Sequence, residues 1–425
     1  MCLVNVILLL VNLNQIQPVK VEKVPLHLQH IAYFLVNKMY SFVSFRIINK
    51  TTRFYHTKSS LLRPVQFISN NKMLTNTAIS QNEEKEIFMN TLPIITETIL
   101  KNPKFTELPG VGSWMKKVLE YNVGSGKKSR GLATVYSYKM IEKPDNITEE
   151  SLRLACIMGW CVEMLHSYLL VLDDIMDHAI TRRGVPCWYR LPEVGLGAIN
   201  DSVLMHMSMF YILKTYFSQK SCYANILDTF HNSLLNTSIG QHLDYTMAHH
   251  VENNYNYFTM EQYMAIVQHK TAYYTFSLPV CLGLYLANKM DIEMHKKAKE
   301  ITIEIGNFFQ IQDDFIDCFG DESVTGKIGT DIQEGKCTWL AVMALQRCNA
   351  SQRSEFEQCY GSKDPDNVQR IKRLYETLEL PCLYKEYEQK LYESLEQRVK
   401  SEHSGELISS TIGLRLFETI YKRKG

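Results

Sequence analysis

The chain has 425 residues, of which 45% are hydrophobic, and a formal net charge of +1 at neutral pH. A nearly balanced charge gives no overall field that would attract nucleic acid, so we expect no nucleic-acid partner. The eleven cysteines are an odd number and include no CxxC pair, which indicates free thiols rather than a disulfide framework or a zinc site. Partners must therefore be inferred from local sites.

Residues 1–80 differ in composition from the rest of the chain. Between residues 1 and 82 the sole acidic residue is Glu22, whereas lysine, arginine, serine and threonine are frequent. This composition is typical of an organelle transit peptide and predicts a mitochondrial location; for a merely disordered extension the location would be cytoplasmic. The apolar run 3–13 is too short to cross a bilayer, so no membrane span is expected. We assign 1–80 to a leader and 81–425 to one folded domain.

From residue 83 onward, apolar residues recur at spacings of three and four with few helix breakers, which is the period of amphipathic helices. The turn signals that would predict hairpins are sparse. Helices are expected at 84–101, 148–173, 201–219, 226–239, 259–286, 291–314, 339–348 and 366–400. The sequence therefore predicts an all-α fold, a single large helical bundle around a central cavity.

The stretch 169–183, LLVLDDIMDHAITRR, ends an apolar run with three aspartates and closes on Arg182 and Arg183. Asp173 and Asp177 are four residues apart, so they share one face of a helix. Two aligned carboxylates repel unless a cation lies between them. Mg²⁺ characteristically takes one or two carboxylates and shares its other positions with water and substrate phosphates. Read alone, the pattern also fits a solvated acidic helix end.

A second acidic motif lies far downstream in FFQIQDDFID, where Asp313 and Asp317 repeat the spacing of four. Lys327 and Lys336 follow it, as the arginines follow the first motif. Two acidic helix ends, each followed by cations, are hard to explain as independent solvated faces. Facing each other across a bundle, they would hold Mg²⁺ and a diphosphate, with the basic residues neutralising phosphate oxygens.

The loop at 122–131, NVGSGKKSRG, combines three glycines with Lys127, Lys128 and Arg130. A flexible backbone with several cations suits an anion such as a diphosphate, although an ordinary solvated basic loop has the same composition. It lacks the spacing of a P-loop. Further along, the pair at 270–271 (Lys-Thr) lies in a strongly apolar helix, where a lysine ammonium needs water or an anion.

Together these motifs resemble the short-chain trans-isoprenyl diphosphate synthases of the farnesyl diphosphate synthase type. The resemblance runs from about residue 90 to the C-terminus and rests on GKKSRG, DDIMD with TRRG, GQHLD, KTAYY, FFQIQDDFID, TGKIGTD, GKCTW and the basic tail. It implies the isoprenoid synthase fold, a homodimer, prenyl diphosphates as small-molecule partners, and three Mg²⁺ ions per active site. The implied reaction ionises an allylic diphosphate; isopentenyl diphosphate then attacks through its double bond and a proton is lost.

The resemblance also implies roles for individual residues. The implied metal ligands are Asp173, Asp177, Asp313 and Asp317. The implied catalytic residues are Asp173, Asp174, Asp313 and Lys270. The allylic diphosphate would be held by Arg182, Lys270, Thr271, Gln310, Lys327 and Lys336. Isopentenyl diphosphate would be held by Lys127, Arg130, His166 and Arg183, with Lys422 or Arg423 closing over it. Tyr168 and Leu169 would line the pocket that sets chain length.

The sequence departs from the family pattern at the presumed isopentenyl diphosphate site. The family usually has Gln where His166 stands, Asn at Ser129 and Pro-Gly-Gly at 124–126, and two Phe are common at Tyr168 and Leu169. The retained cations favour a transferase that makes geranyl or farnesyl diphosphate. The departures leave an alternative, a terpene synthase that ionises a prenyl diphosphate such as farnesyl diphosphate and releases a sesquiterpene hydrocarbon.

Overall fold

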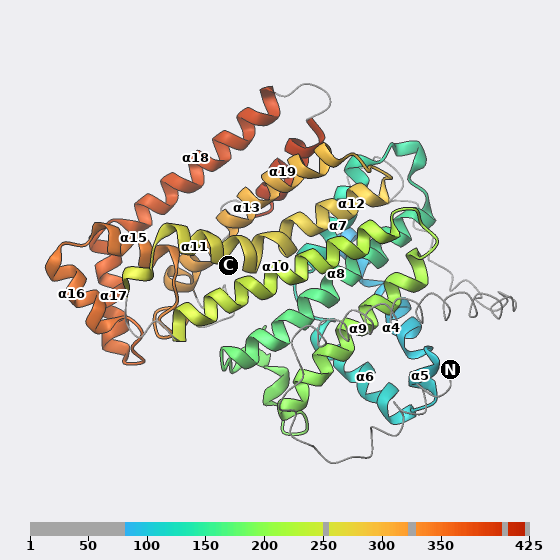
Figure 1. The fold of residues 1–425 in the computed structure, drawn as a ribbon, viewed down its shortest axis with the longest axis horizontal. Coiled ribbons are helices and arrows are strands. Elements are labelled where there is room, and N and C mark those ends of the chain that lie inside the picture. Colours follow the sequence, from blue (N-terminus) through green and yellow to red (C-terminus); the bar gives the residue numbers. More distant parts are fainter. Residues whose placement is uncertain (1–80, 250–254, 322–328, 402–406, 421–425) are drawn as a thin grey trace, which may run out of the picture. The chain divides into compact units, whose positions relative to one another are not determined.

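The computed structural model describes residues 81–249, 255–321, 329–401 and 407–420. The predicted leader, Lys327 and the tail residues Lys422 and Arg423 lie outside these ranges. Within them the fold is all-α, as predicted (Figure 1). The described sheet is one antiparallel hairpin of two short strands, β1 (Thr181–Arg182) and β2 (Val185–Pro186).

Most of the α-helices follow one another with short connections. They are α3 (Gln81–Met89), α4 (Leu92–Leu100), α5 (Pro103–Thr106), α6 (Pro109–Asn122), α7 (Ser129–Ile141), α8 (Glu149–Met176), α9 (Ala198–Phe217), α10 (Tyr223–His249), α11 (Met260–Val267), α12 (Leu278–Leu286), α13 (Ile292–Phe319), α15 (Trp339–Arg347), α16 (Ala350–Cys359), α17 (Pro365–Thr377), α18 (Leu380–Ser401) and α19 (Leu407–Glu418). Longer segments join α8 to α9 and α13 to α15. The 3₁₀ turns are η3 (Pro144–Asn146), η4 (Trp188–Arg190), η5 (Gly195–Gly197) and η6 (Tyr255–Tyr257), and η7 (Gln268–Ser277) is a π-helix.

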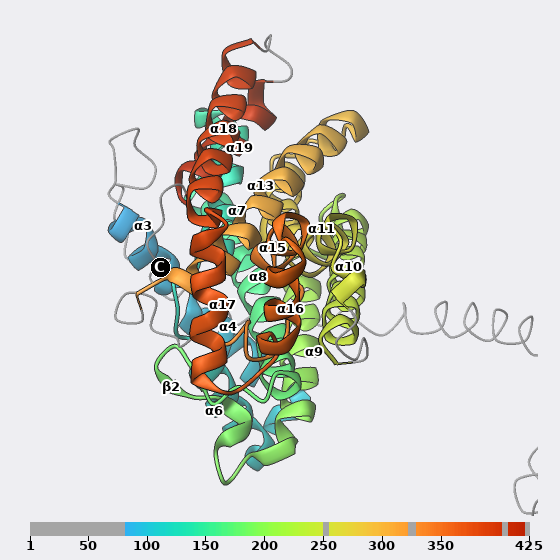
Figure 2. The same ribbon diagram turned by 90° about the vertical axis from the view of Figure 1, so that its left-hand side faces the viewer.

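Helix α8 lies at the centre of the described fold, with α7, α9 and α12 packed against it (Figures 1 and 2). It begins at a capping box in which Thr148 and Ser151 exchange hydrogen bonds, and residues 155–167 are then buried without interruption. A helix that is apolar all round is stable only when it is buried. By length and composition α8 is also a candidate membrane span, but 78% of its apolar window is buried inside the fold, as in a core helix.

The segment from α11 to α12 is continuous, as predicted, but its middle is the π-helix η7. Two glycines on neighbouring helices lie against η7. A Cβ atom at Gly240 of α10 would lie 2.0 Å from the Lys270 amide nitrogen, and one at Gly306 of α13 would lie 2.6 Å from Ala272 Cα. Such close backbone approach is open only to glycine. π-Helical turns within helices are frequent at functional sites. The position of η7 between α10 and α13 is therefore a candidate functional site.

Some helix boundaries differ from the prediction. The segment expected at 84–101 is two helices, because Pro93 lies in the first turn of α4. The segment expected at 366–400 is broken at Glu379, which has a left-handed backbone with φ of 57°, and Pro381 follows in the first turn of α18. Helices α6, α7 and α16 were not among the predicted segments. In α16 only Phe356 and Cys359 are buried, so its apolar period is weak.

Candidate active site

The first acidic motif lies at the C-terminal end of α8, where Asp173 is in the last turn and Asp177 follows the helix. The helix dipole places partial negative charge at this end, so two carboxylates here need cations. Other elements supply them. Lys270 Nζ lies 3.4 Å from Asp173 Oδ1, and Lys336 Nζ donates to Asp177 Oδ2 at 2.9 Å. Burial alone would raise the pKa of Asp173, but the charges of Lys270, Lys336 and Arg182 lower it, so the group is anionic.

Lys270 of η7 joins α8 to α10. Besides Asp173, its Nζ contacts Asp244 Oδ2 at 2.6 Å, and Gln241 Nε2 donates to Asp173 Oδ1 at 3.1 Å. Burial would lower the pKa of Lys270, but the carboxylates of Asp244 and Asp173 raise it, so the ammonium keeps its charge. Gln241 and Asp244 were not predicted as site residues. Their signal was the spacing of three in GQHLD, which puts them on one helix face.

Lys336 provides one connection between the first acidic motif and the second. Its Nζ lies 2.9 Å from Asp177 Oδ2 and 4.0 Å from Asp331 Oδ1. The Asp331 amide in turn donates to Asp317 Oδ1 of the second motif at 3.1 Å. Burial would lower the pKa of Lys336, but Asp331 and the neighbouring aspartates raise it well above its ordinary value. A charged lysine therefore lies between Asp177 of the first motif and Asp331, whose backbone amide contacts the second motif.

A second connection runs through η7. Thr271, next to Lys270, donates from Oγ1 to Gln310 Oε1 at 2.7 Å, and Gln310 lies on α13 one turn before the second motif. Asp313 and Asp317 are half-buried on α13. Lys270, Thr271, Gln310 and Lys336, which the family resemblance assigns to the allylic diphosphate, thus connect the two acidic motifs. Lys327, assigned to the same diphosphate, lies outside the described residues.

Asp314 of the second motif points into the protein. Its side chain accepts hydrogen bonds from Tyr263 Oη at 2.8 Å, the Trp339 amide at 2.9 Å and Gln310 Nε2 at 3.0 Å. Only 5% of the residue is exposed, and burial raises the pKa of Asp314 to about 7. Asp314 therefore ties α11, α13 and α15 together behind the second motif.

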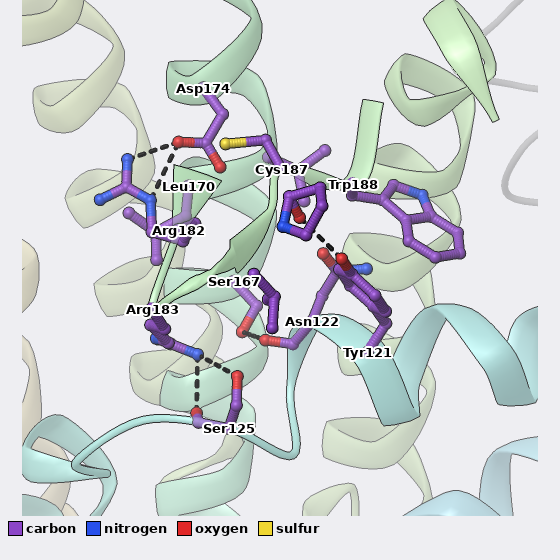
Figure 3. Close-up of a pocket in the computed structure, with 13 residues that line it drawn as sticks. Tyr121, Asn122, Ser125, Ser167, Leu170, Asp174, Arg182, Arg183, Cys187 and Trp188 are labelled. Atoms are coloured by element: carbon purple, nitrogen blue, oxygen red, sulfur yellow. Dashed lines mark hydrogen bonds and ion pairs between the residues drawn. The ribbon is translucent and has the colours of Figure 1, made fainter. Parts of the chain in front are cut away.

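Asp174 takes a corresponding inward position in the first motif and lines a pocket between α6, α8 and the β1–β2 hairpin (Figure 3). Arg182 donates to Asp174 Oδ1 from Nε at 2.9 Å and from Nη2 at 2.5 Å, and its Nη2 also lies 3.5 Å from Asp173 Oδ2. Burial raises the pKa of Asp174 despite this partner. The carboxylate thus fixes Arg182 beside Asp173, while its predicted catalytic role stays a prediction.

A second cluster of cations lies around His166, further back along α8. Arg130 of α7 contacts His166 Nε2 through Nη1 at 3.3 Å, Tyr274 Oη through Nη2 at 3.1 Å and Thr275 Oγ1 through Nε at 3.1 Å. Burial, together with the charges of Arg130 and Arg183, lowers the pKa of His166 well below its ordinary value. The ring is therefore neutral. Because a guanidinium only donates, His166 Nε2 accepts and the proton of the neutral ring is on Nδ1. His166 Nδ1 lies 3.4 Å from Tyr274 Oη.

Arg183 completes this second cluster from the hairpin. Its Nη1 donates to the Ser125 carbonyl at 2.6 Å and to Ser125 Oγ at 3.0 Å (Figure 3). Ser125 belongs to the glycine-rich loop that also carries Lys127, which is exposed. The structure therefore brings Arg130, His166 and Arg183 together. Lys127 lies on the glycine-rich loop, two residues after Ser125.

The two residues predicted to line a chain-length pocket lie between these clusters on α8. Tyr168 is half-buried and stacks on His206 of α9, with ring centroids 4.6 Å apart and planes at 20°. Leu169 is half-buried and shares the helix face of Asp173. Their place on α8 is consistent with a hydrocarbon tail running back from the first motif, and their role stays a prediction.

The first cluster offers oxygen donors to a divalent cation. Among the described residues, no three acidic, histidine or cysteine side chains form a metal cage by themselves. Asp173 and Asp177 nonetheless present carboxylate oxygens at a negative helix end. This arrangement fits an ion such as Mg²⁺, which needs few protein ligands because phosphate oxygens and water complete its shell.

The chain is similar to known proteins in sequence and in fold. Residues 112–378 match the family model described as Polyprenyl synthetase. The chain is 41% identical over 343 residues to the farnesyl pyrophosphate synthase of Murgantia histrionica, which covers 80% of this chain and 83% of the relative. It is 40% identical over 344 residues to farnesyl pyrophosphate synthase 1, mitochondrial, of Arabidopsis thaliana, with 81% and 89% covered. The solved structure of T. brucei farnesyl diphosphate synthase complexed with risedronate superposes with a TM-score of 0.74 and 31% identity, covering 80% of this chain and all of that one.

Proposed function

The chain belongs to the polyprenyl synthetase family and is a short-chain trans-prenyltransferase, and we propose that it makes farnesyl diphosphate between its two acidic motifs. The observation that carries this proposal is the connection of both motifs through Lys336 and through Lys270 with Thr271. The similarity to farnesyl pyrophosphate synthases favours the transferase over a terpene synthase.

The first cluster would hold the allylic diphosphate. Ionisation moves negative charge onto the departing diphosphate, so fixed cations in a partly buried site lower the barrier. Arg182, Lys270 and Lys336 supply that charge, and the carboxylates that contact them keep them protonated and in place. When bound to Asp173, Asp177 and the aspartates of α13, Mg²⁺ would neutralise further charge on the leaving group.

The second cluster would hold isopentenyl diphosphate. Arg130, Arg183 and Lys127 supply the charge, and neutral His166 orients the Arg130 guanidinium by accepting a hydrogen bond from it. Like the amide of a glutamine, neutral His166 has a donor and an acceptor, and both face protein groups. His166 can therefore hold the Arg130 guanidinium although the family usually has glutamine here.

A substrate-omission experiment tests the proposed function. With Mg²⁺ and geranyl diphosphate, the full chain should form farnesyl diphosphate only when isopentenyl diphosphate is added, because isopentenyl diphosphate supplies the five carbons that extend the chain. The product is identified after dephosphorylation by mass-resolved chromatography. Hydrocarbon released without isopentenyl diphosphate, and no chain elongation with it, would instead support the lyase.

We further propose that the protein is a homodimer, as its family resemblance implies. Three aliphatic side chains spaced by four residues are exposed on α9: Ile199 at 47%, Val203 at 47% and Met207 at 58%. Leu235 and Ile239 on α10 are exposed at 60% and 42%. Helices α9 and α10 contact each other through Phe210 and His231, whose ring centroids are 5.1 Å apart, and lie next to each other in Figures 1 and 2. An apolar face of this kind suits a second copy of the chain.

A charge placed in this apolar face tests the dimer. Val203→Glu should give a monomer in sedimentation velocity, because a carboxylate cannot be buried there without a partner. Ile292→Glu is the matched control, since Ile292 is 79% exposed at the start of α13. A Val203→Glu protein that sediments like the wild type would contradict this interface.

Residues 1–80 remain assigned to a leader, and we propose that they direct the domain at 81–425 to mitochondria. The support is the acid-poor, basic composition of the segment. The Arabidopsis relative is also named as mitochondrial.

A further inference from the structure

Lys128 lies beneath the glycine-rich loop and takes no part in the proposed chemistry. Only 2% of the residue is exposed, although lysine is seldom fully buried unless its ammonium is paired. Its Nζ donates to the Val123 carbonyl at 2.5 Å and to the Ser125 carbonyl. Its backbone is left-handed, with φ of 61°, which is unfavourable for a residue with a Cβ atom. The chain thus accepts an unfavourable conformation to direct this lysine inward.

The surroundings of Lys128 hold its ammonium in place. Its Nζ lies 5.6 Å from the centre of the Trp160 ring, within the range of a cation–π interaction. Glu163, also on α8, accepts a hydrogen bond from the Gly131 amide at 2.8 Å and adds negative charge nearby. Lys128 is therefore anchored on α8, the helix that carries His166 and the first acidic motif.

The contacts of Lys128 connect to the residues proposed to bind isopentenyl diphosphate. The Ser125 carbonyl accepts from Lys128 on one side and from Arg183 Nη1 on the other. Lys128 is the N-cap residue of α7, and Arg130 lies in the first turn of that helix. The exposed Lys127 immediately precedes it. Lys128 thus shares the Ser125 carbonyl with Arg183 and lies next to Lys127 and Arg130 in the chain. Its placement therefore affects the directions of these three cationic side chains.

We propose that Lys128 is a positioning residue for isopentenyl diphosphate. Its ammonium draws the Val123 and Ser125 carbonyls inward, which fixes the loop so that Lys127, Arg130 and Arg183 are arranged to receive one diphosphate. The proposal rests on the proposed function, because it concerns the second substrate of that reaction. It predicts a defect confined to that substrate, since Lys128 has no described contact with the acidic motifs.

Replacement by methionine tests the role of the ammonium. Lys128→Met should raise the KM for isopentenyl diphosphate about tenfold or more, because the glycine-rich loop loses the hydrogen bonds from the Lys128 ammonium. The KM for geranyl diphosphate should change less than about twofold. Lys128→Arg should restore much of the affinity, since it keeps a charged donor. Lys116→Met, on the exposed side of α6, is the control. A Lys128→Met enzyme with an unchanged KM for isopentenyl diphosphate, or with both KM values raised in parallel, would overturn the proposal.

The pH profile gives a second test that does not depend on Lys128→Met folding. Burial lowers the pKa of Lys128 to about 8; Glu163 of α8 opposes this shift, whereas Arg183 and Lys85 of α3 add to it. The ammonium therefore loses its proton above about pH 8, and kcat/KM for isopentenyl diphosphate should fall there. Lys128→Arg should remove that fall, because arginine stays charged. An identical alkaline fall in Lys128→Arg would contradict the proposal, whereas wild-type protein that makes no farnesyl diphosphate would contradict the proposed function itself.

Discussion

Alanine at Asp173, or at Asp313, is expected to reduce turnover by about a thousandfold or more. Asp173 is the carboxylate on which Lys270, Arg182 and Gln241 converge. Its removal would take away an oxygen that we propose as a ligand for Mg²⁺, and Lys270 would keep its contact with Asp244. The charge proposed to face the departing diphosphate would be both weakened and displaced. Asp313 would supply the corresponding oxygen from α13.

The measurement is steady-state turnover of both variants with geranyl and isopentenyl diphosphates over a range of Mg²⁺ concentrations. Loss of a metal ligand should also raise the Mg²⁺ concentration needed for half-maximal rate. Asp145→Ala is the control, because Asp145 is exposed in η3, outside both clusters. Far-ultraviolet circular dichroism checks the fold of each variant. Near-normal rates in Asp173→Ala or Asp313→Ala would refute the metal assignment.

The sequence predicted which residues lie close together where regular helix geometry decides it. The spacing of four predicted that Asp173 and Asp177 share one face, and the structure brings Asp173 to Lys270 and Asp177 to Lys336. The long apolar pattern at 148–173 likewise predicted α8 closely, because a buried helix needs apolar residues on every side. Local periodicity was sufficient in these cases.

Features that depend on contacts between distant segments were not predictable in this way. The adjacent lysines of the glycine-rich loop have the same chemistry, yet Lys127 is exposed and Lys128 buried, which depends on Trp160 and the turn that ends at Lys128. The role of Asp244 depends on Lys270 reaching it from η7. A π-helix has no apolar period of its own that a single sequence reveals.

The second large effect is expected at Gly240, which lies on α10 against η7. In Gly240→Ala the new methyl group would lie 2.0 Å from the Lys270 amide nitrogen and 2.4 Å from Lys270 Cα, so α10 and η7 must move apart. Overpacking of this kind costs about 1–3 kcal/mol of unfolding free energy. The movement also carries Lys270 away from Asp173 and Asp244. A displacement of about 1 Å at a catalytic group can cost about a hundredfold in rate, so kcat should fall by that order.

Gly110→Ala provides the matched comparison, because Gly110 is also helical, in α6, and a Cβ atom there meets nothing within 4 Å. It should leave the rate unchanged and stabilise α6 slightly, since alanine favours helix over glycine. Urea unfolding measured beside kcat separates the two consequences in Gly240→Ala. If the variant unfolds earlier but turns over at the wild-type rate, the clamp on η7 is structural and does not set the position of Lys270. If kcat falls while the variant is still folded and the KM for isopentenyl diphosphate is nearly unchanged, the backbone contact at Gly240 positions the lysine that is proposed to face the leaving diphosphate.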